Sequence, residues 1–201
     1  MGRRSSSKQR KQPSAKVKKW LNSLLVQLQT TSLNGLSIDD MARLAGRSKS
    51  TLYEYFNTKE DVLMAACAQR IELISGRLFD QASGNNDLIE HYEQLVRIFI
   101  AGISDITIGF LNDVQKYYPT TWTLIDTFTD RFVEYLIGIY QRGIDSGEFR
   151  YIQLDLVRQL DKYFVTEVVT NQELYAPQGI SLSQLVEEYL QMRMHGIVRL
   201  E

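Results

Sequence analysis

The chain has 201 residues, of which 44% are hydrophobic and 23% charged, so it can bury a core of its own and has the composition of an ordinary globular protein. No apolar run is long enough to cross a bilayer, no signal peptide follows the basic N-terminus, and the single cysteine excludes an internal disulfide framework, so we expect a cytoplasmic protein that does not associate with membranes. The net charge of −1 hides an asymmetry, because residues 1–60 carry 12 basic and 4 acidic side chains (+8) and the remainder carries 11 and 20 (−9), which indicates a polyanionic partner for the first part only.

The first part of the chain begins with a basic tail rich in Ser and Gln, residues 1–14, which we expect to be disordered. Apolar residues then recur at helical spacing in four segments. Ser37 has the features of an N-cap, and Gly46 suits a helix end because glycine tolerates positive φ. The expected helices run approximately over residues 15–28, 37–46, 48–56 and 58–78.

The rest of the chain resumes the helical pattern after a Gly-Asn-Asn break at residues 84–86. Pro119 marks a helix boundary, since proline disfavours helix in the residue before it. The expected helices run approximately over residues 88–103, 106–118, 124–145, 155–174 and 181–198. Because no segment alternates like a strand, the predicted fold is all-α with about nine helices.

A tight turn at residues 45–48 joins the expected short helices at residues 37–46 and 48–56. The two helices and the turn form a helix-turn-helix unit. The second helix of this unit enters the major groove of DNA, and its free N–H groups also attract phosphate. Leu52 and Phe56 would anchor this helix to the core. The residues expected on its DNA-facing side, or just after it, are Arg47, Lys49, Ser50, Thr51, Tyr53, Tyr55 and Lys59.

The same stretch carries a family resemblance. The run Thr-Leu-Tyr-Glu-Tyr-Phe-Asn-Thr-Lys-Glu at residues 51–60 follows an Ala-Gly turn and resembles the DNA-binding domain of the TetR family of transcriptional regulators. The resemblance covers about residues 15–65, and the Gly-Glu-Phe-Arg at residues 147–150 is also similar to the family. It implies a three-helix DNA-binding head, a linking fourth helix and a larger helical ligand-binding body.

The resemblance also implies roles for single residues. It implies DNA contacts by Thr51, Tyr53, Tyr55 and Lys59, and a phosphate contact by the capping hydroxyl of Ser37. Two differences from the family occur. Leu28 and Ser32 stand where the family usually has Phe and Gly, which concerns the exit from the first helix. Arg47 replaces a small apolar residue, and this change would add a base or phosphate contact or shift the operator preference.

The expected domains are therefore a disordered tail at residues 1–14, a helix-turn-helix DNA-binding domain at 15–60 and an effector-binding and dimerisation domain at 61–201.

The last domain is rich in Tyr and Phe, and the resemblance implies an effector pocket between its central helices. Most aromatic residues at helical spacing are plain core, but pockets are also mostly apolar. The candidate pocket residues are Tyr117, Trp122, Phe128 and Tyr163.

The last two helices have wide apolar faces, more than one chain needs, which favours a two-fold four-helix interface as in the family. The alternative is that both faces pack inward. The candidate interface residues are Val157, Phe164, Val168, Leu182, Val186, Tyr189, Leu190 and Met194.

An enzyme is not expected. The only histidines, His91 and His195, lie far apart in the sequence, and no metal-binding, phosphate-binding or nucleophile motif occurs, so we expect no catalytic residues, metal or cofactor. Cys67 lies on an apolar stripe, which is a poor place for a thiolate. A DNA-processing protein such as a recombinase, with the same head, is the alternative. The sequence favours a homodimeric transcriptional regulator that binds a palindromic operator and a small-molecule effector. We expect a repressor rather than an activator.

Overall fold

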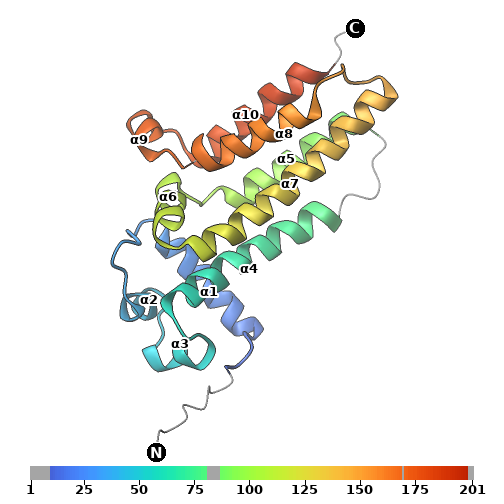
Figure 1. Cartoon of the computed structure of the whole chain (residues 1–201). Coiled ribbons are helices and arrows are strands. Elements are labelled where there is room, and N and C mark those ends of the chain that lie inside the picture. The colour runs from blue at the N-terminus through green and yellow to red at the C-terminus, as the bar shows by residue number, and fades with distance from the viewer. Residues whose placement is uncertain (1–9, 81–86, 169, 199–201) are drawn as a thin grey trace, which may run out of the picture.

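The computed structural model describes residues 10–80, 87–168 and 170–198, and within these ranges the fold is all-α with ten α-helices, one more than expected (Figure 1). No single described helix is long and apolar enough to cross a bilayer, although α5 and α6 would pass the same test jointly as a bent pair. The helices are α1 (Ala15–Leu28), α2 (Ile38–Leu44), α3 (Lys49–Tyr55), α4 (Lys59–Asp80), α5 (Leu88–Ile103), α6 (Ile108–Tyr117), α7 (Pro119–Ser146), α8 (Leu154–Tyr163), α9 (Gln172–Tyr175) and α10 (Leu182–Ile197).

The head consists of α1, α2 and α3 and lies at one end of an elongated molecule (Figure 1). Its core is small and aromatic. Trp20 of α1 meets Phe56 edge to face, with ring centroids 6.1 Å apart, and Leu52 of α3 is fully buried beside them. This geometry is favourable for aromatic pairs and fixes α3 on α1.

The helix α4 links the head to the body, because it packs on α1 at one end and on α5 and α7 along its length (Figure 1). Within the body, Phe99 of α5 stacks on Phe132 of α7 with ring centroids 4.2 Å apart. The buried hydroxyl of Tyr92 donates to the carbonyl of Leu190 at 2.8 Å, which attaches α10 to α5. The helices α8 and α10 run side by side along the outer face of the body (Figure 1).

The helices differ from the sequence prediction in two main places. The expected helix at residues 155–174 is divided into α8, a π-helical segment (Phe164–Val168) and the short α9. The helix α7 begins at Pro119, five residues earlier than expected, because proline is favourable at the first helical position. The end of α7 lies at Ser146, close to the expected position, and the capping residue Gly147 has a φ of 83°, the left-handed conformation that glycine supplies.

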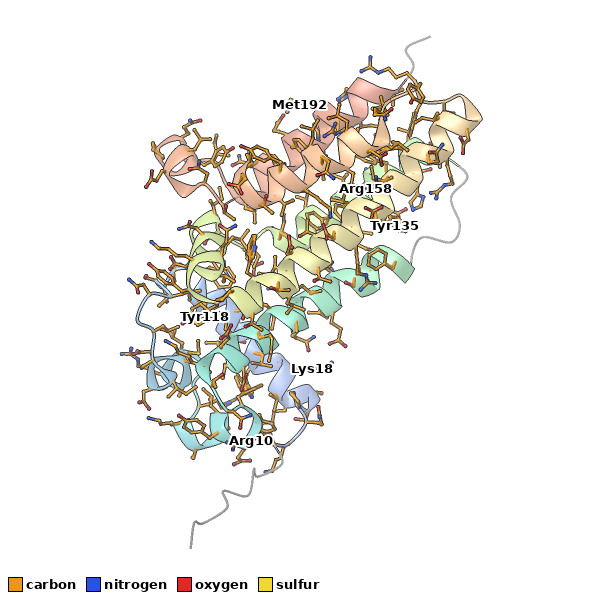
Figure 2. The ribbon with its side chains drawn as sticks, in the orientation of Figure 1. Arg10, Lys18, Tyr118, Tyr135, Arg158 and Met192 are labelled. Carbon is orange, nitrogen blue, oxygen red and sulfur yellow. The ribbon has the colours of Figure 1, made fainter. Side chains whose placement is uncertain are left out.

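The end of the basic tail contacts the head. Lys11 donates its backbone N–H to the carbonyl of Glu54 at 3.1 Å, and its ammonium forms an ion pair with the Glu54 carboxylate at 2.6 Å. Arg10 donates to the side chain of Asn57 at 2.8 Å, and Figure 2 places it beside the head. Arg10 and Lys11 thus have partners in the head, and the remaining part of the predicted disordered tail, residues 1–9, lies outside the described part of the chain.

Candidate functional site

The turn of the helix-turn-helix is built by local capping interactions. The Ser37 hydroxyl accepts from the backbone N–H of Asp40 at 3.1 Å, and the Asp40 carboxylate accepts from the backbone N–H of Ser37 at 3.1 Å, so α2 begins with a complete capping box. The hydrogen bond from Ser37 also lowers the pKa of the Asp40 carboxyl. Gly46 then takes a φ of 61°, which turns the chain toward α3.

The helix α3 presents its first turn to solvent. Ser48 caps it by accepting from the N–H of Thr51 at 3.1 Å, and the hydroxyls of Ser50 and Thr51 each lie 2.8 Å from the Ser48 hydroxyl. Arg47, Lys49 and Ser50 are exposed, and Tyr53 is 36% exposed. Because Leu52 is buried on the opposite side, this face is available to a partner.

Lys49 and Tyr55, which are predicted to contact DNA, also have partners within the chain. Lys49 forms an exposed ion pair with Asp39 at 2.8 Å, and its pKa is raised by that hydrogen bond. An exposed ion pair contributes little to stability, so a phosphate can replace Asp39. Tyr55 is half-buried and its ring meets Phe56, which makes it partly a core residue.

Lys59 lies at the start of α4, but its ammonium points toward the junction of head and body. It donates to the carbonyl of Leu36 at 2.9 Å and lies 5.7 Å from the centroid of the Tyr118 ring. Tyr118 in turn donates its hydroxyl to the carbonyl of Leu33 at 3.3 Å, and Figure 2 shows it at this junction. The structure thus gives Lys59 a structural contact that the sequence did not indicate.

The segment between α1 and α2, residues 29–36, is held by α6 of the body. Asp113 of α6 accepts from the backbone N–H of Leu33 at 2.8 Å. At the start of α6, Thr107 donates its N–H to the Gln29 side chain at 2.9 Å. These bonds, with those of Lys59 and Tyr118, form a head–body junction on the segment that leads into the helix-turn-helix.

The body contains a cavity of about 130 Å³, lined by side chains from α1, α4, α5, α6, α7, α8, α10 and the π-helical segment. The lining is almost wholly apolar. Its aromatic members are Phe99, Phe110, Trp122, Phe128, Phe132 and Phe164, with the ring of Tyr189. Ile106, Phe110 and Leu111 bring the cavity into contact with α6 and the loop before it, and thus with the head–body junction.

Few polar groups line the cavity. The guanidinium of Arg70 forms a bidentate ion pair with Asp105 and also donates to the carbonyl of Gly102 at 3.0 Å and the side chain of Asn22 at 3.2 Å. The hydrogen bond from Arg70 lowers the pKa of Asp105. Cys67 is buried, and desolvation raises the pKa of its thiol to about 12, so the thiol is neutral.

The other polar part of the lining is a cluster between α8 and α10. Asp161 is 4% exposed, and its Oδ1 accepts from the Arg193 guanidinium at 2.7 Å and from the Tyr189 hydroxyl. Burial raises the pKa of Asp161, although the cation opposes that shift. Tyr189 also stacks on Phe164, with ring centroids 3.8 Å apart, so this cluster joins the two outer helices.

The predicted pocket residues divide into two pairs. Trp122 and Phe128 line the cavity. Tyr163 is 61% exposed on α8, and Tyr117 lies under the ammonium of Lys116 at 5.3 Å; neither lines the cavity. Periodicity locates an aromatic residue on a helix face, but the side of the helix that meets the cavity depends on packing.

The predicted dimer interface residues mostly belong to the core of one chain. Val157, Phe164, Leu182, Val186, Leu190 and Met194 are buried within the monomer, and Val168 and Tyr189 are half-buried. Because these six side chains expose little surface, they offer little area to a second chain, and the outward faces of the same helices are the better candidates for an interface. The exposed apolar residues of the same helices are Leu156 (57%), Leu160 (46%), Tyr163 (61%) and Met192 (65%).

Sequence reasoning missed the head–body junction and the Asp161 cluster. Asp113 and Tyr118 meet residues that are 80 and 85 positions away in the chain, and Asp161 meets an arginine 32 positions away. No local pattern marks such pairs. Among the described residues, no three potential metal-ligating side chains cluster.

Comparison with known proteins agrees with the site. Residues 25–66 match the family described as bacterial regulatory proteins, tetR family. An uncharacterised HTH-type transcriptional regulator of Bacillus subtilis (strain 168), YvaF, is 28% identical over 123 residues, which are 60% of this chain and 64% of that protein, so this chain spans less than two thirds of its relative's length.

Solved structures share the whole fold. The fatty acid degradation regulator FadR from Bacillus halodurans is 23% identical, with a TM-score of 0.65 over 90% of this chain and 96% of its own. FadR from Bacillus subtilis, solved with stearoyl-CoA, is 19% identical, with a TM-score of 0.62 over 87% of this chain and 96% of its own. Such identities establish the fold alone. The match at residues 25–66, which hold the capped helix-turn-helix, makes this segment similar to the tetR family of bacterial regulatory proteins, and the chain as a whole shares the fold of these solved regulators.

Proposed function

We propose that the chain is a homodimeric transcriptional repressor that binds a palindromic DNA operator and releases it when a small molecule enters the central cavity. The observation that carries the proposal is the exposed first turn of α3, in a positively charged head, on a chain whose body holds an apolar cavity. The alternative proposed from the sequence, a DNA-processing protein such as a recombinase, has no support from the comparisons.

The head would place α3 in the major groove, with Arg47, Lys49, Ser50, Thr51 and Tyr53 toward DNA. Base edges in that groove carry the sequence information, whereas phosphate contacts fix the register. Ser37 would contact phosphate at the start of α2. We assign Tyr55 and Lys59 lesser roles in DNA contact, because the first packs on Phe56 and the second is held by Leu36.

The dimer would form through α8 and α10. Leu156, Leu160 and Tyr163 follow one another at intervals of four and three residues, so they share one face of α8. Met192 lies on the outward side of α10, as Figure 2 shows. Two heads held by such a pair would reach half-sites separated by about 34–36 Å, or a multiple of that distance.

The route from cavity to head is the junction on residues 29–36. A ligand that contacts Phe110 or Leu111 would shift α6, and Asp113 and Tyr118 would carry that shift to the segment before α2. The ligand acts only by binding the two arrangements with different affinities. FadR from Bacillus subtilis was solved in complex with stearoyl-CoA, which supports the proposal that a chain of this fold binds a small-molecule effector.

The test begins by selecting bound sequences from random duplex DNA with the purified chain. A Tyr53→Phe, Lys49→Ala double variant should then bind the selected operator roughly tenfold to a hundredfold more weakly in a gel-shift assay. The matched control is Tyr151→Phe, Lys116→Ala, at an exposed tyrosine and an exposed lysine of the body, which should bind like the unmodified chain. Equal losses in both variants, or none in either, would refute the assignment of α3.

The dimer surface is tested separately. Leu160→Glu should give monomers by sedimentation velocity, because a carboxylate at the centre of an apolar interface is left unpaired. Leu73→Glu is the control, since Leu73 is a similarly exposed leucine (48%) on α4. Dimers that persist in Leu160→Glu would refute this interface.

A further inference from the structure

The charges around the central cavity restrict what it can hold. Of the lining residues, Arg70 is the one cation and Asp161 the one anion. Both terminal nitrogens of Arg70 already donate to Asp105, and one each to Gly102 and Asn22. Asp161 is compensated by Arg193 and accepts from Tyr189. An incoming carboxylate or phosphate would therefore find no free counter-charge in the cavity.

A buried charge without a partner is strongly disfavoured, because desolvation is not repaid by an ion pair. Breaking the Arg70 ion pair to free its guanidinium would leave Asp105 without that partner and would also release Asn22 of α1. The two charged groups of the lining are thus held mainly by partners behind the cavity wall, Asp105 for Arg70 and Arg193 for Asp161, and most of the remaining lining is hydrocarbon and aromatic ring.

The volume restricts the size of the occupant. A cavity of about 130 Å³ is close to the roughly 150 Å³ of an engineered apolar cavity that binds benzene. The rings of Phe99, Phe132 and Trp122 belong to the lining, and aromatic rings suit a planar ring in offset or edge-to-face contact. A long acyl chain would need the cavity to open well beyond its observed volume.

From charge, lining and volume together, we infer that the central cavity takes a small, uncharged, apolar molecule of the size of a single aromatic ring and rejects anionic molecules of the same size. The inference gives the chemical class of the effector for the repressor proposed above. Only the role of this molecule as an effector rests on that proposed function. Binding itself follows from the cavity whether or not the chain binds DNA.

The experiment uses the full chain and two probes that share a ring and seven carbons, toluene and benzoate. Toluene should raise the Tm and give a saturable signal in ligand-observed NMR, since a ligand that binds only the folded state stabilises it. Benzoate should bind roughly a hundredfold more weakly. Benzoate binding as tightly as toluene would overturn the inference, and so would stearoyl-CoA binding in the absence of any toluene binding.

Variants locate the binding. Val133 is 4% exposed and lines the cavity, so Val133→Phe should fill it and abolish the Tm shift with toluene. Ile125→Phe, at a half-buried lining position, is a second filling variant in case the first does not fold. Val26→Phe, at a 43% exposed position of α1 outside the lining, should keep the shift. Toluene binding that persists unchanged in a folded filling variant would overturn the inference.

Operator binding is measured in parallel, so that the two proposals can fail separately. Toluene binding without loss of operator affinity leaves the ligand class standing and refutes the effector role. Operator release by an anionic acyl compound, with no binding of toluene, refutes the ligand class and leaves the repressor standing.

Discussion

Two glycines of α7 allow the packing of the body to be tested with the same substitution. A Cβ built on Gly143 would lie 2.1 Å from Cδ2 of Phe149, whereas a Cβ on Gly138 would have no neighbour within 4 Å. Phe149 is 1% exposed, and its backbone N–H donates to the Gly143 carbonyl at 2.9 Å, so the ring has little room to move. Gly143→Ala should therefore destabilise the chain, and Gly138→Ala should stabilise it.

The magnitudes follow from two opposing contributions. Replacing glycine by alanine inside a helix stabilises by roughly 0.5–1 kcal/mol, and this applies at both positions. Overpacking costs about 1–3 kcal/mol, and the short contact with Phe149 favours the upper end. The expected net loss for Gly143→Ala is about 2 kcal/mol, which for a chain of this length lowers the Tm by roughly 4–8 °C, whereas Gly138→Ala should raise it by about 1–4 °C.

The assay is urea and thermal unfolding followed by circular dichroism, with both variants and the unmodified chain at one protein concentration, since association changes apparent stability. A Gly143→Ala variant as stable as Gly138→Ala would refute the reasoning, because the two substitutions differ only in the space beside them. An unchanged Gly138→Ala would instead show that helix propensity is offset at that site.

Three further predictions concern the junction, a buried histidine and the cysteine. Asp113→Asn should weaken the charged hydrogen bond to the backbone N–H of Leu33 and lower the free energy of unfolding by about 1–2 kcal/mol. Amide hydrogen exchange should then become faster at residues 29–36 than in the rest of the head. Burial, reinforced by the positive charge of Arg142, lowers the pKa of the His91 imidazole below its usual 6.5. Between that lowered value and 6.5 the unfolded chain binds more protons than the folded chain, so the free energy of unfolding should fall as the pH decreases through this range. The His91→Gln variant should lack this part of the pH dependence when it is measured by urea titration. Burial raises the pKa of the Cys67 thiol from 9.0 to about 12, so at neutral pH its thiolate fraction is roughly a thousandfold smaller than in the unfolded chain. Iodoacetamide should therefore label Cys67 quickly only in urea. Equal labelling rates with and without urea would contradict the burial of this thiol.

The head could be predicted from sequence because its determinants are local. The Ser37 capping box, the glycine at position 46 and the spacing of Leu52 and Phe56 each act within a few residues, and the structure contains all of them. The existence of the helices other than α9 was also predictable, since each of them has apolar residues at helical spacing. The division of the expected helix at residues 155–174 was not, because a π-helical segment has no distinct pattern of apolar residues.

Side chain environments on α8 and α10 could not be predicted in the same way. Both helices have apolar residues on more than one side, and the sequence does not indicate which side meets α5 and α7. Val157 and Leu160 are three residues apart and similar in chemistry, yet Val157 is 6% exposed and Leu160 46%. The cavity depends likewise on the packing of many helices, and only Trp122 and Phe128 among its predicted members line it.

The two tryptophans of the chain occupy separate parts of the molecule. Trp20 is buried in the head against Phe56, and Trp122 lines the central cavity. The chain thus carries two intrinsic fluorophores with different surroundings. With Trp20 replaced by Phe, the emission that remains would report on the occupancy of the cavity, and with Trp122 replaced it would report on the head, so ligand entry and the response of the DNA-binding end can be timed separately in one protein without an added dye.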